Sequence, residues 1–468
     1  MLHFDADLKI ISLEMPLWPA GINADGCSTN ESGAKKLIER YGLVSPSMRC
    51  VVHAGDGSLK RLANSKTMNV EAVTEFLIPF RKVMKHFQLS GKSTASLNDV
   101  LHVMGMKKVH LFSFCPTRMM YLLTCCAKSV ELVVPLCDVL VTLDLKKEQR
   151  DSFMGPKSMS IMHILADLDL TFRAGLLKQL DTDNGLIINA YRINEEFYQQ
   201  LEGDVKFPKL KSFLDSLTED EHGNIKFTAR AGENDHDITL NCSHRPIRAT
   251  RNAEPQDRTQ IIKEEAEDLK QQILDNLVTN VKSQIQSGTL VEYASAFDMH
   301  STRSLEDRLE FVRSIGNVYC KSYVQKVDDD TQDEYWQDYQ ISIRYPAKIN
   351  GEVEDLVKEF KDIWPTLNKL WRPFATKYKK SEGNRKFWQH ILSIHSVTHP
   401  HLCTLIEILF SVAMSTGPLE RSYSKLAKIC YKDRNRLLPE HLESLYLLSL
   451  LNDECDYEDA IFELENAP

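Results

Sequence analysis

The sequence lacks the excess of positive charge that is expected of a protein that wraps nucleic acid. It holds 57 lysine and arginine residues against 66 aspartate and glutamate residues, so its formal net charge is −9. A broadly basic surface is therefore excluded. Any contact with DNA would have to come from local patches of lysine and arginine.

The sequence also lacks a membrane-spanning run, a secretory signal and a disulfide framework. No apolar run approaches the ~20 residues that cross a bilayer. The first residues carry acidic groups where a secretory signal needs a basic start. The eleven cysteines are scattered, unlike those of a small disulfide-bonded module. We expect a soluble intracellular protein with no membrane partner.

The sequence does contain enough apolar residues for a sizeable core, because they make up 43% of its 468 residues. A chain of this length is expected to form about two to four domains. Its pattern predicts a short strand at 8–15, a turn-rich loop carrying Asp25, a short helix at 34–43 and a buried strand that ends at His53. Apolar spacings of three and four predict helices from about 68 to 215 and again from about 258. The stretch near 216–257 is rich in Gly, Asn, Asp and charge, which predicts a loop or linker.

The strongest pattern lies near the C-terminus, in residues 410–453. A short apolar segment leads to a small-residue turn, the string Glu-Arg-x-Tyr-Ser, basic residues, Arg-Asn and a leucine-rich helix. This order resembles the C-terminal dimerisation region of the hAT-family DNA transposases. The matching positions are Ser415, Glu420, Arg421, Tyr423, Ser424, Arg434, Asn435, Leu438, Leu442, Leu445 and Leu448. The resemblance implies dimerisation through Arg421, Tyr423, Leu438, Leu442, Leu445 and Leu448.

The apolar residues of this segment indicate an interaction surface even when the family resemblance is set aside. Leu442, Leu445, Tyr446 and Leu448 give one short helix more apolar surface than a chain end usually buries, so the helix needs a partner surface. Two alternatives stay open, because the partner can be a second chain or the helix's own domain. The resemblance implies a homodimer, or pairing with related hAT-derived proteins.

An N-terminal segment resembles the same family. There the second catalytic Asp sits in an Asp-Gly or Asp-Asn turn after a strand, followed by a helix and a Cys-x-x-His. Asp25, Cys50 and His53 match this order and imply a catalytic Asp and two residues at the DNA. The alternative for Cys50 and His53 is a satisfied pair in a core.

A third segment, FCPTRMM, resembles the family's Thr-Arg-Trp at the start of its helical insertion. Thr117 and Arg118 match and imply that Arg118 binds DNA, while Met119 replaces the tryptophan. The family's tryptophan is implied to stack on a displaced base, which needs a large flat ring that methionine does not supply. The alternative for Arg118 is a cation on a helix surface.

Together these resemblances imply a fold class of α/β plus all-α. An RNase H-like domain is interrupted by a large helical insertion, and the chain is mostly helical overall. The resemblance implies three domains. Residues 1–66 are the first, truncated half of the RNase H-like domain, and residues 67–400 are the helical insertion with a polar linker near 216–257. Residues 401–468 are the dimerisation region, which completes the RNase H-like domain. Asp25 and Glu420 would then meet in space.

The family's strand cleavage resembles three-carboxylate sites that hold two divalent metals. Asp5 and Asp7 precede Asp25 by too few residues for the two strands and helix that normally separate the first two carboxylates. We therefore expect the first catalytic Asp upstream of Met1 and no transposition activity. Asp25 and Glu420 alone would hold any Mg²⁺, the cofactor of active relatives. No other cofactor and no small-molecule substrate are expected.

The leading hypothesis is thus a transposase-derived interaction protein that dimerises through its C-terminal region and, by resemblance, is nuclear. One alternative is a DNA-binding transcriptional regulator that contacts phosphates. Its candidate residues are Lys35, Lys36, Lys60, Arg61, Lys107 and Lys108. Another alternative is a truncated form of an active transposase. A zinc enzyme built on His390, His395, His399 and His401 is disfavoured, since helix-surface and loop histidines explain that cluster.

Overall fold

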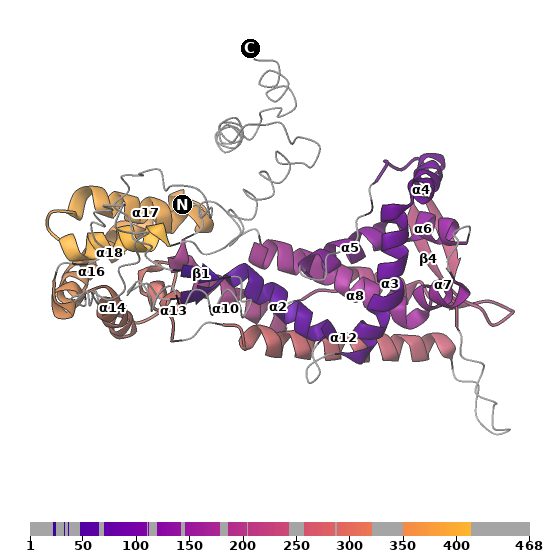
Figure 1. Cartoon of the computed structure of the whole chain (residues 1–468), viewed down its shortest axis with the longest axis horizontal. Helices are drawn as coiled ribbons and strands as arrows, with labels where there is room; N and C mark the ends of the chain where they lie inside the picture. The colour runs from indigo at the N-terminus through magenta and orange to yellow at the C-terminus, as the bar shows by residue number, and fades with distance from the viewer. Residues whose placement is uncertain are drawn as a thin grey trace, which may run out of the picture. The chain divides into compact units, whose positions relative to one another are not determined.

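The computed structural model describes residues 22–24, 32, 36, 47–64, 70–109, 111, 119–141, 146–177, 186–203, 205–242, 257–285, 288–320, 349 and 351–412. They form a mostly helical protein, as predicted, with two small sheets (Figure 1). Contacts divide the chain into two compact units. Unit 1 takes residues 1–52, 180–189 and 289–468, and unit 2 takes residues 53–179 and 190–288.

Unit 2 is therefore inserted, in sequence, between two parts of unit 1. The sequence predicts a helical insertion at 67–400, and this division into domains stays a prediction; by its contacts, the inserted unit ends at Gly288. The difference arises because the helices between residues 290 and 411 pack on one another. Amphipathic periodicity predicts each of these helices, but it does not tell which core each one covers.

Unit 2 is built around helix α8 (Pro156–Phe172). From Ser158 onward every residue of α8 except Leu170 is buried, as expected for a central helix that is covered by neighbours on all sides. Around it pack α3 (Glu71–Leu89), α5 (Met120–Glu131), α7 (Lys147–Phe153), α11 (Pro208–Asp215), α12 (Arg258–Lys282) and the π-helix η1 (Arg173–Leu177) (Figure 1). The remaining helices are α2 (Val51–Asn64), α4 (Gly91–Val103), α6 (Val133–Leu140) and α10 (Ile187–Gly203).

Buried polar groups tie α8 to its neighbours. The Asp167 carboxylate accepts hydrogen bonds from the backbone N–H groups of Lys209 (3.1 Å) and Leu210 (3.0 Å) and so caps the start of α11. His163 stacks on Phe213 at 4.6 Å between ring centroids, and its Nδ1 lies 2.7 Å from the Met159 carbonyl oxygen. Burial lowers the pKa of His163 to about 4, so the ring is a neutral member of the core.

A small antiparallel sheet at 218–239 overturns, over these residues, the prediction of a loop or linker near 216–257. It consists of β3 (Thr218–Glu219), β4 (Ile225–Ala231) and β5 (Asn234–Thr239), in that order. Ile225, Phe227 and Ile238 are buried, while the other face is polar and carries a Thr228–Asp237 hydrogen bond of 2.8 Å between paired positions. Only a few apolar residues alternate with polar ones along these strands. The many polar residues around them therefore hide the strand pattern in the sequence.

Gly232 makes the β4–β5 turn possible. Ala231 pairs with Asn234, so Gly232 and Glu233 form a two-residue loop. Gly232 has a φ of 62°, a region that L side chains avoid. A Cβ at this position would also overlap the carbonyl oxygen of Met104, a backbone atom that has little room to move.

Substituting Gly232 with alanine is expected to destabilise unit 2 by about 3 kcal/mol, because backbone strain and overlap add. Gly105→Ala is the matched control: its φ is 69°, but nothing lies near its would-be Cβ, so about 1 kcal/mol is expected. Urea unfolding followed by far-UV circular dichroism measures both. All five tryptophans fall within the ranges of unit 1, so the tryptophan fluorescence transition should not move. Equal costs for the two variants would contradict the overlap.

The first part of unit 1 is a parallel pair of short strands, β1 (Ile22–Ala24) and β2 (Ser47–Arg49), with Ile22 opposite Ser47. Strand β1 lies where the sequence predicts a loop. The strand expected to end at His53 stops at Arg49, and α2 begins at Val51, so His53 is helical. Polar neighbours and the brevity of both strands hide them from a search for alternation.

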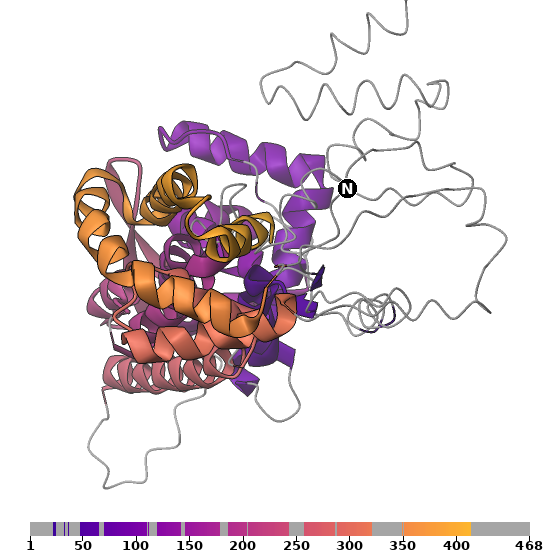
Figure 2. The same ribbon diagram turned by 90° about the vertical axis from the view of Figure 1, so that its left-hand side faces the viewer.

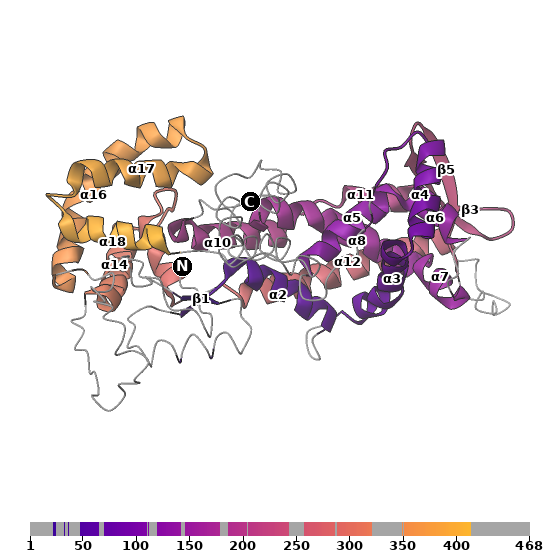
Figure 3. The same ribbon diagram turned by 45° about the horizontal axis from the view of Figure 1, so that its top comes forward.

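The second part of unit 1 is a helical assembly. It contains α13 (Leu290–Tyr293), the 3-10 helix η2 (Ala294–Phe297), α14 (Leu305–Tyr319), α16 (Val353–Lys377), α17 (Lys380–His395) and α18 (Pro400–Ser411). Helix α16 packs against α14, α17 and α18, and α17 packs against α18. Figure 2 shows α16, α17 and α18 in orange to yellow and α14 in salmon. In Figure 3, α18 lies beside both α16 and α17.

Candidate functional site

Most of the predicted site residues lie outside the described residues. These are Asp25, Arg118, Glu420, Arg421, Tyr423, Leu438, Leu442, Leu445 and Leu448. Cys50, by contrast, follows β2 and is fully buried, and His53 is half-buried on α2. The burial of Cys50 fits a core residue better than a residue that touches DNA.

The described ranges contain no group of three or more His, Cys, Asp or Glu side chains that could hold a metal ion. The histidines of the C-terminal helices contact other side chains instead of forming a metal site. The rings of His395 and His399 lie 5.4 Å apart, and His401 pairs with a glutamate. Burial raises the pKa of the Cys403 thiol to about 11, so this thiol is protonated and a poor nucleophile at neutral pH.

A buried polar cluster fixes the start of α17. Asn384, with no exposed surface, donates from Nδ2 to Asp298 Oδ1 (2.7 Å) and to Asn189 Oδ1 (2.6 Å), and its Oδ1 accepts from the backbone N–H of Met299 (3.0 Å). One turn later, Trp388 Nε1 donates to the Phe297 carbonyl at 2.8 Å. Helix α17 is thereby held to the segment 297–299 at two successive turns.

Arg308 of α14 bonds to residues on both flanks of the segment 297–299. Its guanidinium donates to the carbonyls of Ala296 (2.5 Å) and Ser301 (2.6 Å) and lies 4.7 Å from the Trp364 ring centroid. Burial lowers the pKa of Arg308 to about 10, while Asp298 opposes this shift. The group stays charged at neutral pH and acts as a buried hydrogen-bonding hub.

Aromatic rings fill the space between α16 and α17. Phe387 contacts Trp371 (5.3 Å), Phe374 (5.5 Å) and Trp388 (5.3 Å) between ring centroids, each near an edge-to-face angle. Such pairs add about 0.5–1.5 kcal/mol each beyond the area they bury. The two helices therefore form one rigid block around these rings.

Helix α18 is attached to this block at its first turn. The Glu359 carboxylate of α16 lies 2.6 Å from His401 Nδ1 and accepts from the backbone N–H of Leu402 at 2.9 Å. A carboxylate at a helix N-terminus satisfies unpaired N–H groups and favours the helix dipole. Gly351 allows a close approach to the His401 ring, which a Cβ would overlap. The apolar face of α18, with Leu402, Leu405, Ile406 and Leu409, is buried.

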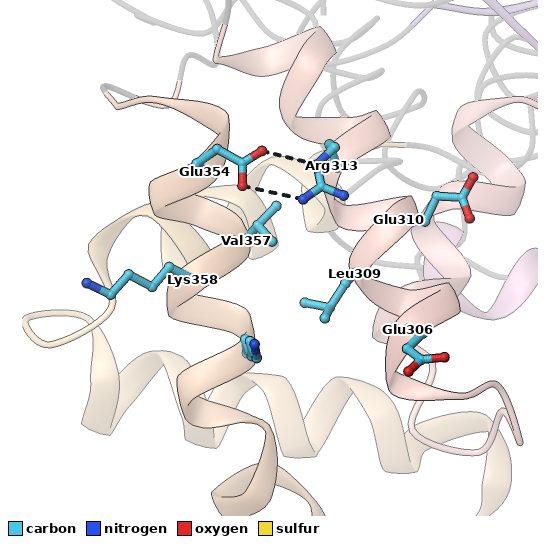
Figure 4. A pocket seen from close by; sticks show the side chains of 8 residues that line it. Glu306, Leu309, Glu310, Arg313, Glu354, Val357 and Lys358 are labelled. Atoms are coloured by element: carbon cyan, nitrogen blue, oxygen red, sulfur yellow. Dashed lines mark hydrogen bonds and ion pairs between the residues drawn. The ribbon is translucent and has the colours of Figure 1, made fainter.

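An open groove runs between α14 and α16 (Figure 4). Leu309 and Val357 lie between the helices, and the Arg313–Glu354 ion pair (3.1 Å from Nε to Oε1) spans one end. The other lining residues are Glu306, Glu310, Lys358 and Lys361. These charges are exposed, so each ion pair contributes at most about 1 kcal/mol. The groove offers a mixed-charge surface and holds no nucleophile.

Comparison with known families places α17 and α18 in context. Residues 385–449 match the hAT family C-terminal dimerisation region. The described helices α17, from Arg385 onward, and α18 are therefore the beginning of a family-specific dimerisation module. The chain carries this region, as predicted from Glu420, Arg421 and the leucines. No curated protein matches the chain.

The match begins at Arg385, before the predicted boundary at residue 401. The structure gives a reason, since α17 and α18 share the block that α16 completes. The hydrogen bonds of Asn384 and Glu359 were not predicted, because their partners lie far away in sequence.

We expect Asn384→Ala to lower the unfolding free energy of unit 1 by about 3 kcal/mol, because it leaves the Met299 N–H and the Asp298 and Asn189 side chains without this partner. Asn368→Ala, at an exposed position of α16, is the matched control and should cost less than about 0.5 kcal/mol. Tryptophan fluorescence during urea unfolding reports unit 1. An unchanged midpoint in Asn384→Ala would show that the cluster does not hold α17.

Proposed function

We propose that this chain is a transposase-derived interaction protein that dimerises through its C-terminal region and has no transposition activity. The match of residues 385–449 to the hAT dimerisation region carries the proposal. Its first two helices are anchored by Asn384, Trp388 and Glu359, so the region starts from a fixed base. The proposed partner is a second copy of the chain or a related hAT-derived protein, in the nucleus.

We further infer that the interrupted domain is RNase H-like. Three observations support this proposal. The strands β1 and β2 are parallel, which requires a crossover connection, and Ser32 and Lys36 between them are helical. Asp25 follows directly on β1, the position of a catalytic Asp in the family. Unit 2 interrupts unit 1 in sequence, as a helical insertion would.

The burial of Met119 supports the loss of transposition activity. This residue, which stands where the family has a base-stacking tryptophan, is 2% exposed. The next residue is fixed as well, because the buried Asp56 carboxylate accepts from the Met120 N–H at 2.8 Å. A buried methionine presents no flat ring to a displaced base. Asp25 and Glu420 would then be the remaining carboxylates for any Mg²⁺.

Light scattering after size-exclusion chromatography tests the proposal at micromolar concentration. We expect the full chain to be a dimer, and a chain that ends at Val412 to be a monomer. That end keeps α18, whose apolar face belongs to the core of unit 1. In the full chain, Leu442→Asp with Leu445→Asp should also give a monomer, because charge opposes burial at an interface.

Leu170→Asp, at a leucine of unit 2 that is 68% exposed, is the matched control and should stay dimeric. A monomeric full chain would refute the proposed dimerisation. A dimer that survives both the truncation and the Leu442 and Leu445 substitutions would place the interface elsewhere.

DNA binding is a second candidate function, favoured by a basic corner where α16 meets α17. Its exposed members are Lys369, Arg372, Lys377, Lys379 and Lys386. Glu382 is the only acid between residues 369 and 386, in a chain whose net charge is negative. The rings of Trp371, Phe374 and Tyr378 are partly exposed in the same stretch, and such a combination suits phosphates and bases.

The structure makes two of the earlier candidates less suitable. Lys60 Nζ lies 3.0 Å from Asp56 Oδ2, and Arg61 donates to Ser283 Oγ at 2.8 Å. Lys36, Lys107 and Lys108 are exposed and stay candidates, while Lys35 lies outside the described residues.

Fluorescence anisotropy with a short labelled duplex over a salt series tests the basic corner. Lys379→Glu with Lys386→Glu should weaken binding and flatten the slope of log affinity against log salt by about 2, since each lost phosphate contact removes roughly 0.9. Lys146→Glu with Lys147→Glu, an exposed pair of unit 2, makes the same change of charge and should leave the slope unchanged. Identical slopes for both variants would rule out this corner.

A further inference from the structure

The corner between α17 and α18 exposes apolar side chains that the core of unit 1 does not use. Ile394 is 49% exposed and Val397 is 89% exposed. Among the described residues of unit 1, they are the two large aliphatic side chains with such exposure. They stand three residues apart, at the last turn of α17 and just beyond it, which places them about one helical turn from each other.

The chain around this corner is free of formal charge. From Phe387 to Ile406 the sequence holds no Asp, Glu, Lys or Arg, although these residues make up 26% of the protein. The exposed polar residues beside Ile394 and Val397 are small: Ser393, Ser396 and Thr398. Depletion of charge around exposed apolar side chains is the composition of an interface centre, not of an ordinary solvated surface.

The corner is also firmly built. Thr398 Oγ1 lies 2.9 Å from His399 Nδ1, and the backbone N–H of Thr398 donates to the His395 carbonyl at 3.1 Å. On the far side of the turn, Glu359 fixes the first residues of α18. A preformed surface loses little conformational entropy when a partner binds to it. Less of the binding free energy of its apolar contacts is then offset by ordering.

We propose that the α17–α18 corner, centred on Ile394 and Val397, packs against a second copy of this chain. A second copy is the expected partner because Ile394 and Val397 both lie inside the matched dimerisation region, residues 385–449. The inference rests on the proposed dimerisation and adds a specific surface to it, in a part of the region that precedes the leucine-rich segment. The corner is a self-association surface at the opposite end of α17 from the basic corner.

Sedimentation velocity of the full chain over a concentration series tests this surface. Val397→Asp should raise the dimer dissociation constant by at least tenfold, because a carboxylate would have to lose its hydration at the interface. Ser396→Arg should act in the same direction by bringing charge and bulk to the same place. Both positions are exposed, so the monomer should keep its circular dichroism spectrum and melting temperature.

Val103→Asp is the matched control, since Val103 is 85% exposed on α4 of unit 2. Its dissociation constant should equal that of the unsubstituted chain. If the unsubstituted chain dimerises and Val397→Asp dimerises equally well, the corner is not an interface, and dimerisation through the leucine-rich segment still stands. Equal weakening by Val397→Asp and Val103→Asp would also overturn the inference. A monomeric unsubstituted chain would overturn both proposals.

Discussion

The attachment of α17 to the segment 297–299 is the constraint on which the C-terminal part of unit 1 depends. Asn384 and Trp388 satisfy backbone and side-chain groups that would otherwise be buried without partners, and an unsatisfied buried group costs about 1–3 kcal/mol. Once this helix is fixed, its aromatic side chains define where α16 lies. Helix α18 then docks through Glu359, and the dimerisation region begins from a rigid foundation.

The sequence predicts this protein well where its signals are long or chemically distinctive. Helices with regular apolar spacing, such as α12, and the ordered motif around Glu420 and Arg421 are of this kind, and the family match confirms the motif. Prediction fails where elements are short. Strand β1 has three residues, and in the sheet β3–β4–β5 only one face is buried, so polar residues outweigh the alternation.

The anchoring residues could not be predicted, for a different reason. Asn384 bonds to Asn189 across 195 positions of sequence, and Glu359 bonds to His401 across 42. A lone Asn or Glu in an amphipathic helix carries no sign of such a partner, and most are solvated. The basic corner and the uncharged run that follows it were visible in the sequence as composition. Only the structure shows which of their side chains are exposed.

Helix α17 joins these two surfaces in a single rigid element. Its first half continues the basic corner with Lys386, just after Lys379 at its N-cap, and its last turn carries Ile394 at the uncharged corner. The proposed phosphate contacts would need exposed cations, whereas the centre of the proposed interface would exclude charge, so the two proposed roles would use opposite ends of the helix. Because Asn384, Phe387 and Trp388 hold the first half of α17 to its neighbours, the proposed pairing of two copies would also bring two basic corners into one assembly. Dimerisation and DNA contact would then be coupled through geometry, without any change of shape within unit 1.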